Sequence, residues 1–363
     1  DPLRWRTLAV VGIVALMVVL DSTVINIALP SIQADLGITD AQRQWVVTAY
    51  TIAFGGLLLL GGRIGDDAGR KRSLIAGLIG FAIASAAGGL SDSGLLLVVA
   101  RGAAGAFAAL LAPVTLALIA VSFTDTRERT RAFATYSAIS AGGGAVGLVL
   151  GGLLTQVASW HWCLLINVPI AAIAIALAVP WVRESRTPGP ARYDIPGAIL
   201  GTGGVLAIVY GLAEAGGAGW GSPSAIVPLI GGIVLVAGFL VVEARTAVPL
   251  LPLRVLRDRN RAGAYAASLL SGASLFATFL FISYYLQAVK GFDPLEAGLL
   301  GLPFSVGVVV STWIAQRALP RLGPRTVTTI GFALAAIGTG GLTRIAVSSV
   351  YLTDLLQIGR AHV

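Results

Sequence analysis

Long apolar runs, separated by short stretches that carry most of the charge, dominate the pattern of this chain. A helix needs about 20 mostly apolar residues to cross a bilayer core about 30 Å thick. The sequence contains eleven runs of this kind. They lie near residues 8–29, 45–62, 73–90, 94–121, 132–157, 161–182, 195–213, 225–243, 262–288, 296–318 and 325–346. The pattern predicts an all-α, polytopic helical membrane protein.

The positions of Lys and Arg predict how the runs are oriented. Twenty of the 25 basic residues fall in the N-terminal segment and in every second loop, whereas the opposite loops hold only Arg43 and Lys290. Because short cytoplasmic loops carry the excess of basic residues, the N-terminus is expected in the cytoplasm. The net charge of +8 then reflects topology signals beside anionic lipid. No basic patch of the kind that binds nucleic acid is predicted.

Composition excludes several classes of protein. Only 12% of the residues are charged, against roughly 25% in an ordinary soluble domain. The single Cys163 and the two histidines, His161 and His362, rule out a disulfide framework or a Cys/His metal site. We find no nucleophile with a base and no phosphate loop, so we expect neither an enzyme nor a cofactor. With 23 Arg and 2 Lys, the composition is typical of a GC-rich bacterial gene, and the inner membrane is the expected location.

Asp21 lies inside the first apolar run. A carboxylate in the middle of a membrane costs about 2.5–3.5 kcal/mol on insertion scales, so it persists only where it faces a cavity or a partner. A titratable group at that depth can carry a proton. The alternative is a packing residue whose carboxylate is satisfied by Ser22 or Thr23. Glu214, near the end of the seventh run, is the next candidate acid.

Arg101 is the one cation well inside a run, the fourth. A guanidinium does not lose its charge, so it requires carboxylates, carbonyls or water around it. Close to Asp21 it would favour the ionised form of that acid. The alternative is a side chain that extends past Gly94 to the membrane interface.

Small residues share one face of the fifth run. Positions i and i+4 stack on a helix, so this run brings its glycines onto one side. They are Gly143, Gly147, Gly151 and Gly152. Close contact with another helix follows. The spacing is equally compatible with a surface on which helices slide and with simple packing.

The loop from Gly62 to Arg72 combines acidic and basic side chains in a tight turn. Acidic residues contribute little to membrane orientation, so Asp66 is not needed there for topology. It suggests an ionic latch, in which Asp66 would meet the exposed N–H groups at the start of the eleventh run near Thr326. The alternative is a solvated turn. The gate candidates in this loop are Gly62, Asp66, Gly69, Arg70 and Arg72.

Together these segments resemble the major facilitator superfamily, and within it the family of drug:proton antiporters with fourteen spans. The match covers the chain to about residue 350, and in this order the motifs are highly specific. They are Leu20-Asp21-Ser22-Thr23 with Ala28-Leu29-Pro30, the loop Gly62 to Arg72, Arg101 with Gly105, Ser159-Trp160-His161-Trp162, Asn167-Val168-Pro169, Asp194-Ile195-Pro196-Gly197, Pro249-Leu250-Leu251-Pro252-Leu253 and Tyr285-Leu286-Gln287.

The resemblance implies a secondary transporter that exports small amphipathic or cationic compounds in exchange for protons. It implies proton coupling by Asp21 and Arg101 and a cytoplasmic gate in the loop between the second and third spans. Two positions depart from the family. Ala104 replaces the usual Gln of the fourth-span motif, and Leu148 replaces the Pro that usually follows the glycine at 147. The second departure weakens the expectation of strict antiport more than that of transport.

The resemblance also predicts the domain organisation. Residues 1–182 form an N-terminal six-helix bundle, residues 183–261 two extra linker helices, and residues 262–357 a partial C-terminal bundle of three helices. Since the family has fourteen spans, a C-terminally truncated chain is expected. Residues 358–363 back-translate to a common sequencing-library adapter, so we expect a non-native tail after Gln357. A short natural tail is the alternative.

Two other functions remain open at this stage. One is export of a specific metabolite, such as an antibiotic made by the host, and the other is a membrane sensor that does not transport. In each case we expect a monomer in the lipid bilayer with a small-molecule ligand. Protons are the second expected partner, and no nucleic acid is expected.

Overall fold

A computed structural model describes residues 3–186, 194–246, 249–251 and 253–342. Within these ranges the chain is helical and contains no strand, which confirms the predicted all-α class. The helices are α1 (Arg4–Leu36), α2 (Asp40–Ala68), α3 (Arg70–Gly89), α4 (Gly94–Ser122), α5 (Thr126–Val157), α6 (Trp162–Leu165), α7 (Asn167–Trp181), α8 (Ile195–Ala218), α9 (Pro223–Arg245), α10 (Arg254–Arg257), α11 (Arg259–Tyr284), the π-helical η1 (Tyr285–Val289), α12 (Pro294–Leu300) and α13 (Leu302–Leu342). The predicted tail, 358–363, lies outside the described residues.

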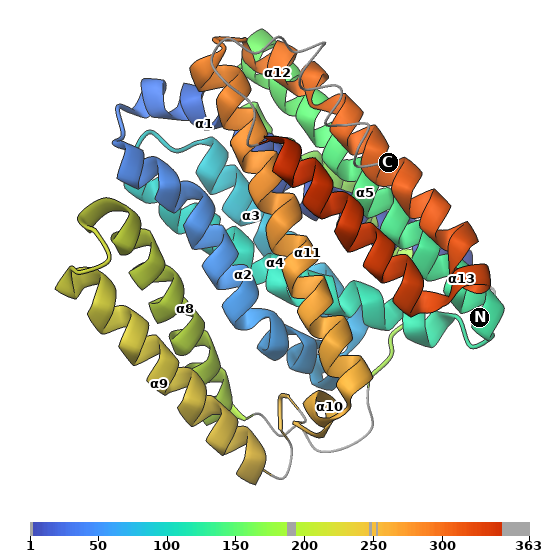
Figure 1. The fold of residues 1–363 in the computed structure, drawn as a ribbon. Coiled ribbons are helices and arrows are strands. Elements are labelled where there is room, and N and C mark those ends of the chain that lie inside the picture. The colour runs from blue at the N-terminus through green and yellow to red at the C-terminus, as the bar shows by residue number, and fades with distance from the viewer. Residues whose placement is uncertain (1–2, 187–193, 247–248, 252, 343–363) are drawn as a thin grey trace. The chain divides into compact units, whose positions relative to one another are not determined.

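Ten helices in the described part of the chain are long and apolar enough to cross a membrane. The sixth predicted run forms one such span from α6 and α7 together. The eleventh run, near 325–346, begins just after Gly323, where a φ of 76° divides α13 into two halves joined at a sharp bend (Figure 1). Its residues 343–346 lie outside the described part.

Several helices extend beyond the apolar runs, because capping residues and not hydropathy fix where they begin. At the start of α2, the Thr39 hydroxyl accepts a hydrogen bond from the Gln42 N–H at 3.3 Å, and the Gln42 side chain accepts one from the Thr39 N–H at 2.9 Å. This reciprocal pair satisfies two N–H groups that the helix leaves without a partner. Ser93 accepts the Leu96 N–H at the start of α4 in the same way.

The described residues divide into two compact units, and α1 contributes to both. The first unit draws on residues 1–18, 30–133 and 164–263. Within it, α4 packs against both α2 and α3, and α3 packs against α7. The helix pair α8–α9 joins this unit through contacts between α8 and α2.

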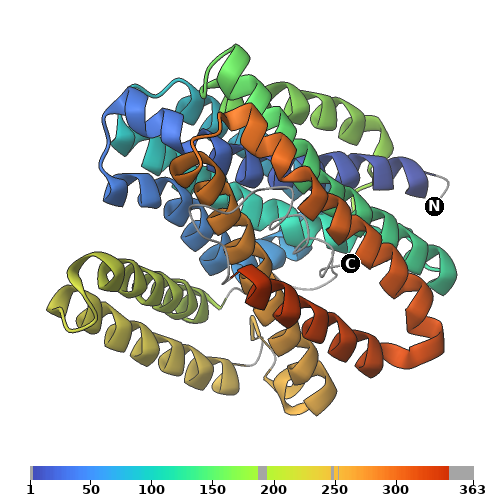
Figure 2. The same cartoon turned by 45° about the horizontal axis from the view of Figure 1, so that its top comes forward.

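Glycines hold α8 and α9 together as an antiparallel hairpin, in which the two helices lie side by side in both views (Figures 1 and 2). A Cβ added to Gly211 of α8 would lie 2.8 Å from the carbonyl oxygen of Ala225, and one on Gly232 of α9 would lie 2.8 Å from that of Gly204. These backbones approach more closely than any larger residue permits. On the α2 side, the Thr202 hydroxyl donates to the Gly56 carbonyl oxygen at 2.6 Å.

The second unit comprises residues 19–29, 134–163 and the described part of 264–363. It therefore contains the middle of α1, most of α5 and the helices from α11 onward. The predicted division into bundles at residues 182 and 261 stays a prediction. The two compact units draw on non-contiguous parts of the chain and are a different kind of division.

Candidate functional site

Asp21 lies in the middle of α1, where it is only 1% exposed. The hydroxyl of Ser22 donates to the Val19 carbonyl oxygen at 2.8 Å, and that of Thr23 donates to the same oxygen at 2.9 Å. Each hydroxyl has a single proton. Both hydroxyls therefore bond the backbone of α1, and the alternative in which they satisfy Asp21 is not tested.

Arg101 is buried against α2, with 2% of its surface exposed. Its Nε donates to the carbonyl oxygen of Val46 at 3.4 Å, and its guanidinium carbon lies 4.3 Å from the centre of the Tyr50 ring. A carbonyl dipole and an aromatic face both stabilise a cation in surroundings that hold little water. The side chain contacts α2, and the alternative, extension past Gly94 to the membrane interface, is not tested.

Two glycines bring α4 close enough to α2 for these contacts. A Cβ on Gly105 would overlap the backbone of Tyr50, and a Cβ on Gly61 would overlap that of Ala109. The glycine four residues after Arg101 therefore sets the distance across which the guanidinium meets Val46 and Tyr50. Asp21 belongs to the second unit and Arg101 to the first, so their electrostatic coupling stays a prediction.

The predicted loop from Gly62 to Arg72 is wrong in extent, because α2 continues to Ala68 and only Gly69 separates it from α3. Two ion pairs lie at this junction. The guanidinium of Arg70 contacts the Asp66 carboxylate at 2.5 Å, and Arg63 Nε lies 3.2 Å from Asp67 Oδ2. The side chains of Arg70 and Asp67 are 12% and 8% exposed. The junction is accordingly half-buried, and Asp66 and Asp67 each pair with an arginine of the same segment. The contact of Asp66 with residues near 326 is not tested.

Sequence analysis missed Glu184, which follows α7 and holds the start of α3. Its carboxylate accepts hydrogen bonds from the backbone N–H groups of Lys71 at 3.1 Å and Arg72 at 3.2 Å. Its oxygens also occupy the space, 2.7 Å away, that a Cβ on Gly69 would need, and the φ of Gly69 is +106°. A carboxylate at a helix N-terminus is favoured both by the free N–H groups and by the helix dipole.

Glu184 was detectable by the argument already applied to Asp66. It is an acid inside a basic loop, flanked by Arg183 and Arg186. Its partner, the N-terminus of α3, is more than a hundred residues away in the sequence, so nothing in the loop itself predicts the contact.

The glycine face of α5 packs against α1 within the second unit. All four predicted glycines are buried. A Cβ on Gly147 would overlap the side chain of Thr23, and one on Gly151 would lie 3.0 Å from the Cα of Val24. By contrast, Gly142 and Gly144 have open space around them. Close helix contact is confirmed at Gly147 and Gly151, whereas sliding is not tested.

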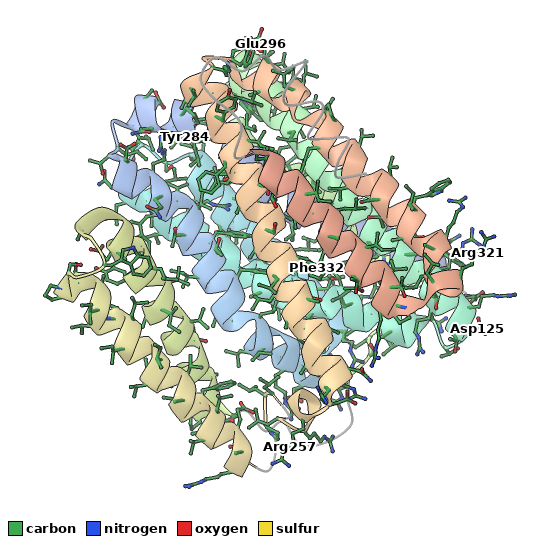
Figure 3. All side chains as sticks on the ribbon, in the orientation of Figure 1. Asp125, Arg257, Tyr284, Glu296, Arg321 and Phe332 are labelled. Atoms are coloured by element: carbon green, nitrogen blue, oxygen red, sulfur yellow. The ribbon has the colours of Figure 1, made fainter. Side chains whose placement is uncertain are left out.

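The second unit also contains a cavity of about 680 Å³ between α11 and α13. Aliphatic and aromatic side chains line it, including Phe304 and Phe332, and hydroxyls of Ser271, Ser274 and Thr278 add polar groups. Phe332 lies on the second half of α13 (Figure 3). No charged side chain of the described residues lines the cavity. Apolar walls with a few hydroxyls suit an amphipathic small molecule.

Comparison with known proteins decides the family. Residues 11–358 match the Major Facilitator Superfamily. The chain belongs to this superfamily. Among solved structures, the superfamily chain resembles the peptide transporter POT in complex with sulfate, with a TM-score of 0.66 and 16% identity over 98% of this chain and 79% of that one. It also resembles the xylose transporter XylE from E. coli, with a TM-score of 0.61 and 15% identity over 99% and 84%. These likenesses confirm the predicted fold.

Several relatives of this chain are named for antibiotics. The puromycin resistance protein of Streptomyces alboniger is 47% identical over 98% of this chain and 71% of its own length. The cephamycin export protein of Amycolatopsis lactamdurans is 38% identical over 94% and 71%, and the lincomycin resistance protein of Streptomyces lincolnensis is 36% identical over 92% and 69%. Across the relatives compared, the chain spans between 60% and 71% of their length. The predicted family is confirmed, and its relatives are resistance and export proteins.

Proposed function

We propose that this chain forms part of a secondary transporter that exports small amphipathic or cationic antibiotics in exchange for protons. The observation that carries the proposal is Asp21, a carboxylate 1% exposed in the middle of a membrane-spanning helix. A buried acid in a transporter span is by default a proton or substrate site.

The proposed cycle uses two buried charges. Asp21 takes up a proton when its site opens to the outside, and the compound leaves at this stage. When the site opens to the cytoplasm, Arg101 favours the ionised carboxylate and the proton is released inward. The compound binds next, and each turn of the cycle exchanges one for the other. Arg101 is fixed for this task by Val46 and Tyr50.

The loop between α2 and α3 serves as the cytoplasmic gate of the proposed transporter. Asp66 would latch it closed, together with Gly62 on α2, Gly69 at the turn, and Arg70 and Arg72 at the start of α3. Glu184 supports this assignment, because it ties the start of α3 to the segment after α7. A separate part of the proposal concerns α5. Its face of Gly143, Gly147, Gly151 and Gly152 is proposed as the surface that slides during alternation.

The cavity supports an amphipathic substrate. Its walls are apolar and its hydroxyls can fix one polar group. We propose further that the protein acts as a monomer in the bacterial inner membrane, with its N-terminus in the cytoplasm.

A second candidate is export of one specific antibiotic and not of many drugs. Three of the relatives above carry the name of a single antibiotic, namely puromycin, cephamycin and lincomycin. This observation favours narrow specificity. A non-transporting sensor is the third candidate.

Transport by reconstituted protein tests the proposal. The protein expressed from its complete gene is placed in proteoliposomes, and puromycin movement is followed with and without an imposed pH gradient. Antiport predicts uphill movement that needs the gradient and collapses with a protonophore. Movement indifferent to the gradient would remove proton coupling, and binding without movement would favour the sensor.

A further inference from the structure

Two acidic side chains that the proposed cycle does not use meet at the end of the α8–α9 hairpin opposite its turn. Asp194 precedes α8 and is 6% exposed, and Glu243 lies near the end of α9 and is 3% exposed. They belong to the first unit. Each stands in or beside a motif noted in the sequence, Asp194-Ile195-Pro196-Gly197 and Pro249 to Leu253.

In each carboxyl group, one oxygen accepts a hydrogen bond from a backbone N–H group. Asp194 Oδ1 accepts the N–H of Gly197 at 2.8 Å, so that Asp194 caps α8. Glu243 Oε2 accepts the N–H of Leu251 at 2.9 Å, which holds the segment after α9 against the hairpin.

The other oxygen of each carboxyl group lies beside Gly197. Asp194 Oδ2 and Glu243 Oε1 are both buried, and neither has a hydrogen-bond partner among the described residues. A Cβ on Gly197 would lie 2.5 Å from the first and 2.9 Å from the second, so the two oxygens flank this glycine together. Two facing carboxylates with no donor between them cannot both remain ionised at ordinary cost.

The described charged groups near the pair do not donate to these two oxygens. On α2, which packs against α8, the charged groups of the last turns are Arg63, Asp66 and Asp67, and these pair within their own loop with one another or with Arg70. Among the described residues, the basic groups on either side of the 249–251 segment are exposed and form no ion pair with either carboxyl group. They are Arg245 of α9 and Arg254 and Arg257 of α10, the last labelled in Figure 3.

Two carboxyl groups can bind a proton between them but offer too few ligands for a metal ion. Ca²⁺ takes about 6–8 oxygen ligands, whereas only these two carboxyl groups converge here, and the described residues contain no acidic, histidine or cysteine cluster of metal-binding size. One proton between two carboxyl oxygens makes a short, charge-assisted O–H···O⁻ hydrogen bond.

We propose that Asp194 and Glu243 share one proton and so form a proton-binding site in the hairpin, separate from Asp21. The bound proton keeps both carboxyl groups in place, and Glu243 thereby retains Leu251. Release of the proton leaves two facing negative charges, which separate and free the segment that leads from α9 to α10 and α11. Proton binding at this site therefore controls whether Glu243 retains the N–H of Leu251. This holds whether or not Asp21 carries a transported proton.

Infrared difference spectroscopy of the protein in nanodiscs tests the site during a pH titration. The wild type should show the C=O stretch of a protonated carboxyl group that disappears as the pair loses its proton. Glu243→Gln and Asp194→Asn should each lack this band, because the amide donates an N–H in place of the proton. Asp92→Asn, at an exposed turn, is the matched control and should keep it. Carboxyl bands that are the same in the wild type and in both single variants would overturn the proposal.

Thermal unfolding supplies a second readout with a definite sign. The folded state holds a proton that the unfolded chain releases at lower pH, so the wild-type melting temperature should fall as pH rises across the titration. Glu243→Gln has no shared proton, and its melting temperature should lose this part of the pH dependence. An unchanged dependence in Glu243→Gln would contradict the shared proton.

A third measurement needs no substitution. Amide exchange at Leu251 should rise with pH more steeply than the intrinsic chemical rate, because the hydrogen bond from the Leu251 N–H to Glu243 breaks when the pair loses its proton. The amide of Thr246, bound at 2.9 Å to the Val242 carbonyl oxygen, serves as the internal control and should follow the intrinsic rate. Equal behaviour of the two amides would overturn the proposal.

Discussion

Arg101 makes two contacts that a lysine cannot make together at the same position. Its planar guanidinium contacts the Val46 carbonyl and lies over the Tyr50 ring, and an ammonium keeps at most one of these contacts. Losing one is worth about 1–2 kcal/mol in a desolvated site. We therefore expect Arg101→Lys to lower proton-driven efflux roughly tenfold at equal abundance in the membrane.

The control for this substitution is Arg129→Lys, at an exposed position of α5, which should leave efflux unchanged. Equal efflux from Arg101→Lys and the wild type would show that charge alone suffices at position 101.

At the residue scale, buried charges could be predicted where the signal was local. Asp21 and Arg101 were found because a charge inside an apolar run is visible in the sequence itself, and both are buried. Glu184, Asp194 and Glu243 were not singled out, because their significance depends on the backbone or carboxyl group they meet in the folded chain. Tertiary contacts of this kind leave no periodic signal.

At the scale of helices, Gly105 sets the separation of α2 and α4. A methyl group there would overlap the Tyr50 backbone, and overpacking of this kind costs about 1–3 kcal/mol. Gly105→Ala should lower the melting temperature in detergent. Gly144→Ala is the matched control, because a Cβ at that helical position meets open space, and its melting temperature should be unchanged or slightly higher. Equal melting of the two variants would show that α4 does not depend on this close approach.

Glu184 predicts a measurable effect on another helix. Glu184→Ala removes both acceptors of the Lys71 and Arg72 N–H groups, and losing a cap of this type costs about 0.5–2 kcal/mol. Hydrogen exchange at these two amides should become faster, with little change deeper in α3. Arg186→Ala, at an exposed neighbour, should have no effect. Unaltered exchange in Glu184→Ala would mean that α3 begins stably without the cap.

Element boundaries show why hydropathy predicts spans better than helices. Apolar runs mark the residues that can face lipid, and ten of the eleven predicted runs form candidate spans in the described part of the chain. The run at 132–157 did not reveal that α5 begins at Thr126 and passes through the charged residues up to Arg131. The apolar runs also did not reveal the bend at Gly323, which depends on the φ angle of one residue.

For the whole molecule, the asymmetry of basic loops predicts the topology. Reporter fusions after Arg127 and Arg257 should report the cytoplasm, and a fusion near Trp220, in the turn of the α8–α9 hairpin, should report the outside. A cytoplasmic signal at Trp220 would mean that the number of spans before it is wrong.

The central claim is that Asp21 carries the transported proton, and one measurement tests it most directly. Puromycin efflux driven by a pH gradient is compared between the wild type, Asp21→Asn and Asp92→Asn in proteoliposomes that contain equal amounts of inserted protein. Asn is nearly isosteric with Asp but does not titrate, so Asp21→Asn should lose gradient-driven efflux and keep exchange of puromycin across the membrane without a gradient. Asp92→Asn should match the wild type in both. Undiminished gradient-driven efflux by Asp21→Asn would contradict the account and move the proton site elsewhere, with Glu214 the next acid to test.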